Sequence, residues 1–146
     1  PTGLRVRPPE PGSSNIMPGF DLKAGPDTLS ERVIGAAMEV HRHLGPGLLE
    51  SVYRGAMEQE LLARGIGFAS EVRLPVHYKG ALLDASLRID LLVEDQLVVE
   101  LKSLESVLPV HCAQVLTYIR TGGFGRGLLI NFNVSLLARG VRRFVC

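Results

Sequence analysis

The stretch R-I-D-L-L-V-E-D-Q-L-V-V-E-L-K, residues 88–102, decides how this chain folds. Two apolar segments flank a polar turn around Asp95, which is the pattern of a β-hairpin. Three charged side chains interrupt the apolar pattern, namely Asp90, Glu100 and Lys102. A hairpin centred on Asp95 places Asp90 directly across from Glu100, with Cβ atoms roughly 5 Å apart. Because side chains alternate along a strand, Lys102 shares the face of Glu100, and the three groups are predicted to converge.

Two facing carboxylates need a compensating cation. Like charges across a strand pair repel each other, and burying an unpaired carboxylate costs several kcal/mol. A divalent cation such as Mg²⁺ binds carboxylate and carbonyl oxygens, and such a site can activate water against a phosphodiester. Lys102 would then orient the water or neutralise charge developing on phosphate. The alternative is that Lys102 simply bridges to Glu100 on an ordinary edge strand, because this spacing is a loose pattern.

Length and composition predict a single globular domain. The chain has 146 residues, of which 46% are hydrophobic and 21% charged, enough to bury a core. No apolar run approaches the roughly 20 residues of a membrane helix, and the N-terminus has no signal-peptide pattern. We therefore expect a soluble, cytoplasmic protein with no membrane contact. Cys112 and Cys146 lack the spacing of a zinc site or a disulfide framework.

Residues 1–28 differ in composition from the rest of the chain. They hold six of the nine prolines and four glycines, with no hydrophobic periodicity. Such a segment cannot bury enough apolar surface to fold. We expect a flexible tail followed by one domain over residues 29–146.

Charge is distributed unevenly, although the net charge is only +1. Residues 29–105 carry eight Lys and Arg against twelve Asp and Glu, whereas residues 106–146 carry five Arg and no acid. An acidic site beside a basic segment suits a metal-dependent enzyme acting on a polyanion. Arg139, Arg142 and Arg143 are the predicted phosphate contacts. A solvated basic face is the alternative explanation.

Hydrophobic periodicity and turn residues predict three helices and five strands. The predicted helices cover residues 29–43, 49–64 and 109–121, and the predicted strands cover residues 71–78, 82–93, 96–102, 127–132 and 141–145. The first helix begins after a capping-box signature, Thr28 with Glu31. Pro75 is tolerable only in an edge strand. The order ααβββαβ(β) predicts a mixed sheet flanked by helices, an α/β or α+β fold.

Polar side chains on two of these helices are candidates for the site. Glu50 and Tyr53 share one face near the start of the second helix, although an acid in a first turn is also favoured by the helix dipole. The third helix carries His111, Gln114 and Tyr118, of which Gln114 and Tyr118 are one turn apart on one face.

Six blocks of sequence resemble a known family. They are G-P-G-L-L-E-S-V-Y (45–53), P-V-H-Y-K-G (75–80), R-I-D-L-L-V-E-D (88–95), V-V-E-L-K-S (98–103), H-C-A-Q-V-L-T-Y (111–118) and G-L-L-I-N-F-N (127–133). In this order they resemble the GxxExxY protein family, a branch of the PD-(D/E)XK nuclease superfamily, over about residues 29–145. The family name falls on Gly47, Glu50 and Tyr53. The resemblance implies a restriction-endonuclease-like core of helix, three strands, helix and strand.

The resemblance also implies roles for the charged residues. Asp90 matches the metal-binding aspartate of the superfamily, and Glu100 with Lys102 matches its E-x-K motif. Asp90, Glu100 and the Leu101 carbonyl would hold Mg²⁺ or Mn²⁺, while Lys102 would position the nucleophile. Glu50 matches the acidic helix position and would bind the ion, or a second one through water. The proline that precedes the aspartate in the superfamily is replaced by isoleucine here.

Further residues are implied as supporting groups. Gln114 and Tyr118 match the Q-x(3)-Y motif of the recombination-repair branch and would steady the site or the substrate. Tyr53 and His111 are expected beside them. A histidine on the leading helix can also bind the metal, and His41 is the candidate here.

The function implied is metal-dependent hydrolysis of phosphodiester bonds in DNA, with RNA as the second choice. One alternative is a non-catalytic module that binds nucleic acid or a protein. Another is an accessory subunit that works only in a larger complex. A domain this small leaves little room for its own DNA-recognition elements, which suits a homodimer or a larger complex.

Overall fold

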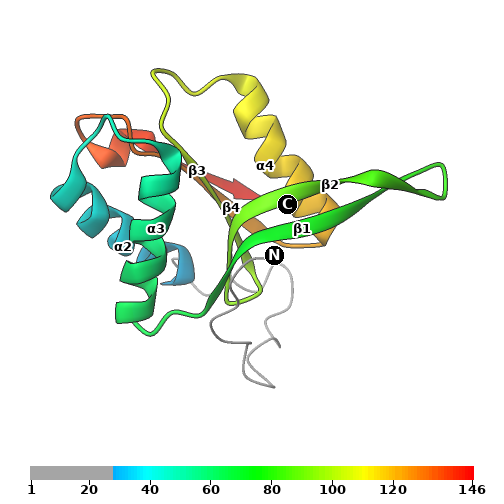
Figure 1. The fold of residues 1–146 in the computed structure, drawn as a ribbon, viewed down its shortest axis with the longest axis horizontal. Helices are drawn as coiled ribbons and strands as arrows, with labels where there is room; N and C mark the ends of the chain where they lie inside the picture. Colours follow the sequence, from blue (N-terminus) through cyan, green and yellow to red (C-terminus); the bar gives the residue numbers. More distant parts are fainter. Residues whose placement is uncertain (1–27) are drawn as a thin grey trace.

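The computed structural model describes residues 28–146, and residues 1–27, where the tail was predicted, lie outside the described part. The elements are α2 (Thr28–Leu44), α3 (Glu50–Ala63), β1 (Phe68–Tyr78), β2 (Ala81–Val93), β3 (Leu97–Lys102), α4 (Pro109–Gly122), β4 (Arg126–Asn131), the short 3-10 helix η1 (Leu137–Gly140) and β5 (Val141–Val145) (Figure 1). The predicted order of helices and strands is therefore confirmed, as an α+β fold. In residues 28–146 no helix combines the length and the apolar character that crossing a membrane requires.

The five strands form one mixed sheet in the order β1-β2-β3-β4-β5. β3 and β4 are parallel, and α4 makes the crossover between them, whereas the other neighbouring strands are antiparallel. β1 lies at an edge of the sheet, which accommodates Pro75 without the loss of a ladder hydrogen bond. A register shift follows between Pro75 and His77.

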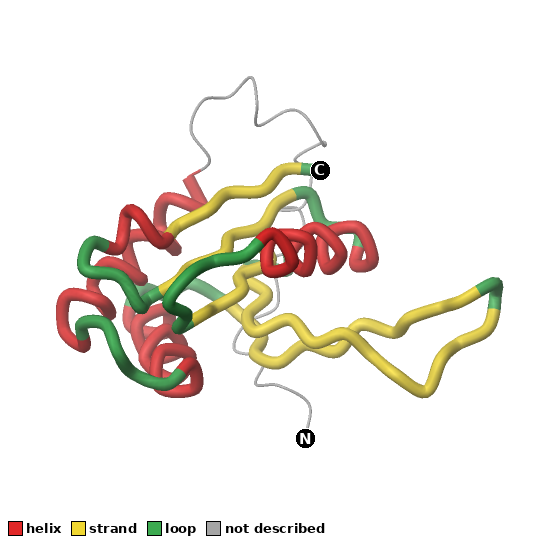
Figure 2. Tube along the Cα trace, turned by 90° about the horizontal axis from the view of Figure 1, so that it is seen from above, coloured by secondary structure: helices red, strands yellow, loops and turns green. Residues whose placement is uncertain are grey.

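The helices lie in two layers on opposite faces of the sheet. α2 and α3 cover one face, where Val33, Met57 and Leu61 pack against Leu91, Val99 and other strand residues. α4 covers the other face, where Val115 and Ile119 pack against Val98 and Leu129. Figure 2 shows α4 separated by the sheet from α2 and α3. Apolar burial on both faces explains why the central strands read as continuous apolar runs.

The hairpin predicted at Asp95 is confirmed. Leu91 pairs with Val99 and Val93 with Leu97, which is the register of a hairpin centred on Asp95. The Gln96 N–H donates a 3.0 Å hydrogen bond to the Val93 carbonyl to close the turn.

Two predicted boundaries were wrong. β1 begins at Phe68, three residues before the predicted strand, because residues 68–70 are all buried and lack the alternation used to find the strand. The first helix already includes Thr28, so Thr28 is not its N-cap, and the preceding residue lies outside the described part.

Gly127 allows α4 to pack closely against the sheet. A Cβ at Gly127 would lie 2.8 Å from Ile119 Cδ1 and 2.9 Å from Val115 Cγ1, both on α4. We expect Gly127→Ala to lower the free energy of unfolding by about 1–3 kcal/mol, because it overpacks this contact. The matched control is Gly125→Ala, whose Cβ would meet nothing within 4 Å. Chemical denaturation of both variants tests this, and equal decreases in stability would contradict the packing of α4.

Candidate active site

The two carboxylates of the hairpin lie where β2 and β3 part. Continuing the observed register by one residue from Leu91 and Val99 places Asp90 opposite Glu100. Asp90 is only 4% exposed, and its Oδ2 accepts a 2.8 Å hydrogen bond from the Leu101 N–H. The Asp90 carboxylate thus replaces a backbone carbonyl as the hydrogen-bond acceptor for β3. This hydrogen bond fixes the position of the carboxylate.

Glu100 is buried with an unsatisfied carboxyl oxygen. Its side chain is 3% exposed, and its Oε1 has no hydrogen-bond partner among residues 28–146. Burial raises the pKa of Glu100 to about 9, helped by a hydrogen bond and charge repulsion from Asp90 and opposed by Lys102. In the absence of a cation, Glu100 is therefore protonated at neutral pH.

A glycine loop and a buried tyrosine bring Glu50 to the same place. Tyr53 is fully buried, and its hydroxyl donates to the Gly45 carbonyl at 2.6 Å and accepts from the Leu48 N–H at 3.2 Å. Gly45 and Gly47 have φ of 67° and 96°, which favour glycine. The loop is thereby fixed, and Glu50 becomes the first residue of α3.

The environment of Glu50 shows that it belongs to this site. Burial raises the pKa of Glu50, while the Lys102 ammonium opposes that rise and the charge of Asp90 adds to it. These effects act over short distances. Glu50 of α3 thus lies within electrostatic range of Asp90 on β2 and of Lys102 on β3, the strand that also carries Glu100.

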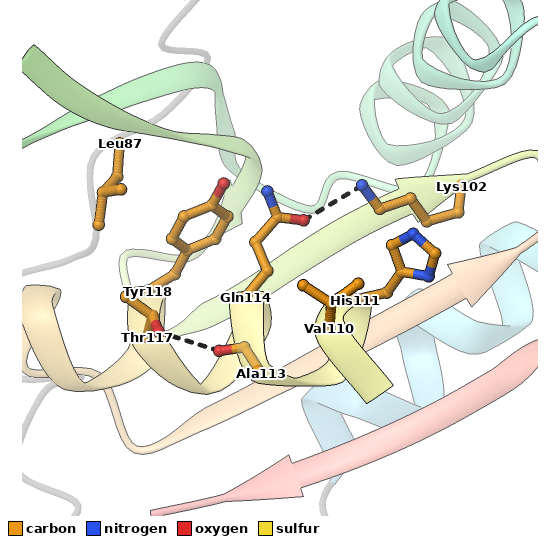
Figure 3. A pocket seen from close by; sticks show the side chains of 8 residues that line it. All are labelled: Leu87, Lys102, Val110, His111, Ala113, Gln114, Thr117 and Tyr118. Atoms are coloured by element: carbon orange, nitrogen blue, oxygen red, sulfur yellow. Dashed lines mark hydrogen bonds between the residues drawn. The ribbon is translucent and has the colours of Figure 1, made fainter. Parts of the chain in front are cut away.

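α4 supplies the neutral polar groups. The Lys102 ammonium donates a 3.2 Å hydrogen bond to Gln114 Oε1, and the Tyr118 hydroxyl lies beside the Gln114 amide on the same face of α4 (Figure 3). Burial, followed by the charge of Glu100, raises the pKa of Tyr118, and a hydrogen bond with Gln114 opposes that rise. Gln114 thus contacts Lys102 from the α4 side, and Tyr118 contacts Gln114.

An open hollow of about 470 Å³ begins at Lys102. Its lining is mainly apolar, with polar groups from α4, and consists of Leu87, Lys102, Val110, His111, Ala113, Gln114, Thr117 and Tyr118 (Figure 3). Its volume is typical of a site for a small organic group.

Three predicted supporting residues have structural partners. His41 Nε2 lies 2.8 Å from the Val134 carbonyl, so this nitrogen is engaged with the loop after β4. Tyr53 stacks on Phe132 with ring centroids 4.4 Å apart and holds the glycine loop, so it positions Glu50 and does not face substrate. His111 Nδ1 accepts a 2.8 Å hydrogen bond from the Leu108 N–H at the start of α4, although His111 also lines the hollow.

The three predicted phosphate contacts do not form one surface. Arg142 and Arg143 are neighbours on β5, so their side chains point to opposite faces of the sheet. Arg143 makes a 3.0 Å ion pair with Glu31 of α2. Arg139 lies in η1. β5 is separated by β4 alone from β3, and Arg142 lies in the same cross-strand row as Glu100, with Leu129 between them.

Sequence reasoning missed two other contributors. Asn131 is 3% exposed and bonds the backbone of Leu104 twice, at 2.9 Å each, which fixes the chain just after Lys102. A lone amide in an apolar strand could have signalled this role. Arg88 lies 3.8 Å from Asp90 Oδ1, and its position two residues before Asp90 on one strand could have indicated the contact.

Comparison with known families agrees with this geometry. The model of the PD-(D/E)XK nuclease superfamily matches residues 27–144. The chain belongs to the PD-(D/E)XK nuclease superfamily. The three α-helices and the mixed sheet of residues 28–146 are consistent with a restriction-endonuclease-like fold. No curated protein and no solved structure matches the chain significantly.

PD-(D/E)XK nucleases generally depend on divalent metals, and the residues present here fit such an ion. Glu100 offers a buried oxygen without a partner, and Asp90 faces it. Within residues 28–146 no group of three or more His, Cys, Asp or Glu side chains is arranged to hold a metal ion. Mg²⁺ does not need one, because it is usually held by one or two carboxylates and keeps several waters.

The raised pKa of Glu100 predicts how pH affects the metal-free protein. The folded Glu100 carboxyl has a pKa of about 9 against an ordinary value of 4.5, so between these values the folded chain binds more protons than the unfolded one. Stability should therefore fall as pH rises from about 5 to about 8, by at most about 1.4 kcal/mol per unit for one proton. Glu100→Gln should flatten this slope.

Denaturation in EDTA at several pH values measures both slopes. Glu58→Gln on α3 is the control, because Glu58 lies outside the carboxylate site and bonds Ser70. Equal pH slopes in wild type and Glu100→Gln would show that Glu100 is already ionised when folded.

Proposed function

We propose that this protein hydrolyses phosphodiester bonds in DNA with the help of Mg²⁺ or Mn²⁺. The observation that carries the proposal is the buried Glu100 carboxyl, which faces Asp90 and has one oxygen without a hydrogen-bond partner, with Lys102 beside it. A purely structural hairpin gains little from this arrangement, because two ionised carboxylates would repel each other and relief of that repulsion requires Glu100 to stay protonated. A site that binds a cation and a phosphate gives the arrangement a use.

Each residue has a role that its surroundings support. Asp90, Glu100 and the Leu101 carbonyl would hold the ion, with Asp90 oriented by the Leu101 N–H. When bound, the ion supplies polarisation of the phosphoryl group and a water of lowered pKa. Glu50, half-buried beside them, would accept a proton or hold a water, because its raised pKa makes it a better base.

Lys102 is the group best placed to act on the reacting phosphate. Gln114 holds its ammonium group at the mouth of the hollow lined by α4. A preorganised cation of this kind stabilises charge that develops in the transition state. Gln114 therefore positions Lys102, and Tyr118 positions Gln114.

The GxxExxY branch is the proposed subgroup within the superfamily. Gly47, Glu50 and Tyr53 act as one unit, in which Tyr53 fastens the loop and so directs Glu50 to the site. That linkage gives a physical reason for the three residues to occur together, which supports the proposal.

The first test is metal binding. Mg²⁺ or Mn²⁺ should raise the melting temperature by an amount that grows with ion concentration, because the ion binds only the folded site. Asp90→Asn should abolish the increase, whereas Asp84→Asn, at the exposed end of the same strand, should retain it. An equal increase in wild type and Asp90→Asn would remove Asp90 from the metal site.

The second test separates an enzyme from a binding module. Lys102→Ala should reduce metal-dependent cleavage of DNA by a factor on the order of 100 or more while changing DNA affinity less than about tenfold. Lys79→Ala, at the exposed end of the β1–β2 hairpin, is the control. Parallel decreases in binding and cleavage would make Lys102 an ordinary phosphate contact. A wild-type protein that binds DNA or RNA without cleaving either would favour the binding module.

A further inference from the structure

Two arginines share one carboxylate at the border of the carboxylate site. Glu71 Oε1 lies 3.3 Å from Arg54 Nη2 and 3.3 Å from Arg88 Nη1. The other terminal nitrogen of Arg88 is 3.8 Å from Asp90 Oδ1. A single carboxylate oxygen thus lies between two guanidinium groups, one of which already contacts a proposed metal ligand.

Both arginines are carried by elements that also carry the site. Arg54 follows Glu50 by four residues on α3, one turn away on the same helix face. Arg88 precedes Asp90 by two residues on β2 and shares its strand face. The positive charge of each arginine lowers the pKa of Glu50, so both act on the site over a short range.

Glu71 is held in an unusual backbone conformation. Its φ is 52°, although it lies inside β1 between the paired residues Ser70 and Val72. This is also where β1 changes the layer it packs against, because Phe68 belongs to the cluster under α2 and α3, and Val72 packs on the cluster under α4. Left-handed conformations of residues other than glycine are strained and concentrate at functional sites.

We infer that Arg54 and Arg88 form a seat for a backbone phosphate of the nucleic acid, and that Glu71 occupies this seat when nucleic acid is absent. The inference rests on the proposed function and names the phosphate contacts of that same site. Two guanidinium groups around one oxygen match the recognition of a phosphate, for which arginine is particularly suited. The seat lies beside Asp90, so it binds the phosphate next to the one that is cleaved.

The exposure of the three side chains permits the exchange. Arg54, Arg88 and Glu71 are 24%, 48% and 35% exposed, so a polyanion can reach them without unfolding the hairpin. Ion pairs this exposed contribute little to stability, so replacing Glu71 by phosphate costs little. Phosphate contacts also release counterions from the nucleic acid, which favours the exchange further.

The test is the affinity for a fluorescent DNA oligonucleotide, single-stranded and duplex, measured in EDTA so that metal-dependent cleavage does not interfere. Glu71→Gln should bind about three to ten times more tightly than wild type, because it removes the anion that competes for the seat. Arg54→Ala with Arg88→Ala should weaken binding and reduce the salt slope by about 0.7–0.9 for each phosphate that is no longer neutralised. In that double variant, adding Glu71→Gln should give no gain.

A matched ion pair on the same helix provides the control. Glu60 and Arg64 pair at 2.7 Å at the far end of α3, so Glu60→Gln and Arg64→Ala should leave DNA affinity unchanged. Glu71→Gly gives a second variant that removes the carboxylate and relieves the left-handed φ, so it remains folded if Glu71→Gln does not. An unchanged or weaker affinity in both Glu71 variants would make the cluster purely structural and overturn the seat.

Measurements of cleavage and of DNA affinity distinguish a failure of the seat from a failure of the proposed function. If wild type cleaves DNA but the variants at Glu71, Arg54 and Arg88 have the same DNA affinity as wild type, the nuclease function is retained and the seat is rejected. Tighter binding by Glu71→Gln in a protein that never cleaves would retain the seat and reject the hydrolysis. A wild-type protein that binds no nucleic acid would overturn both.

Discussion

The structure depends on a contact that is unfavourable in isolation, namely the buried pair of Asp90 and Glu100 across β2 and β3. Apolar packing on both faces of the sheet excludes water from these carboxyls, and that exclusion raises the pKa of Glu100 to about 9. A protonated Glu100 relieves the repulsion in the metal-free protein, and a cation can relieve it in another way. The same burial that stabilises the fold therefore prepares the site for a cation.

The other parts of the site are fixed by connections that serve the fold. Tyr53 closes the glycine loop and so places Glu50, and Asn131 fastens the chain after Lys102. α4, which links the parallel strands β3 and β4, brings Gln114 to Lys102 and Tyr118 to Gln114. Glu71, at the point where β1 changes layers, pairs with Arg54 and with Arg88, and Arg88 borders Asp90. Each functional side chain is thus supported by backbone or packing contacts outside the site.

Much of the fold could be predicted, because its signals are local. Alternation and turn residues define the hairpin around Asp95, and its register follows from symmetry about that residue. The association of Glu50 with the carboxylates could be predicted only through resemblance, because it depends on how α3 docks on the sheet. Charge counting predicted phosphate contacts in the basic C-terminal segment, and it carries no information about which strand or face each arginine occupies. β5 pairs with β4 at the edge of the sheet, and its Arg143 pairs with Glu31 of α2, whereas Arg142 is turned to the other face.

The partners of single side chains were the least predictable features. Nothing in the spacing of His41 signals that its Nε2 meets the Val134 carbonyl, 93 residues away. Nothing local signals that Glu71 adopts a positive φ inside a strand and bridges arginines from α3 and β2. Contacts of this kind arise from long-range packing, and only a three-dimensional structure reveals them.

The most direct test of the central claim is the number of protons released when Mn²⁺ binds. Calorimetric titrations at neutral pH in buffers of different ionisation enthalpy give this number. Because Glu100 is protonated before the ion binds and must be ionised afterwards, we expect about one proton released per ion. Glu100→Gln should bind the ion weakly and release none. Binding of Mn²⁺ by wild type without proton release would show that the ion does not displace the Glu100 proton, and would contradict the assignment of this buried pair as the metal site.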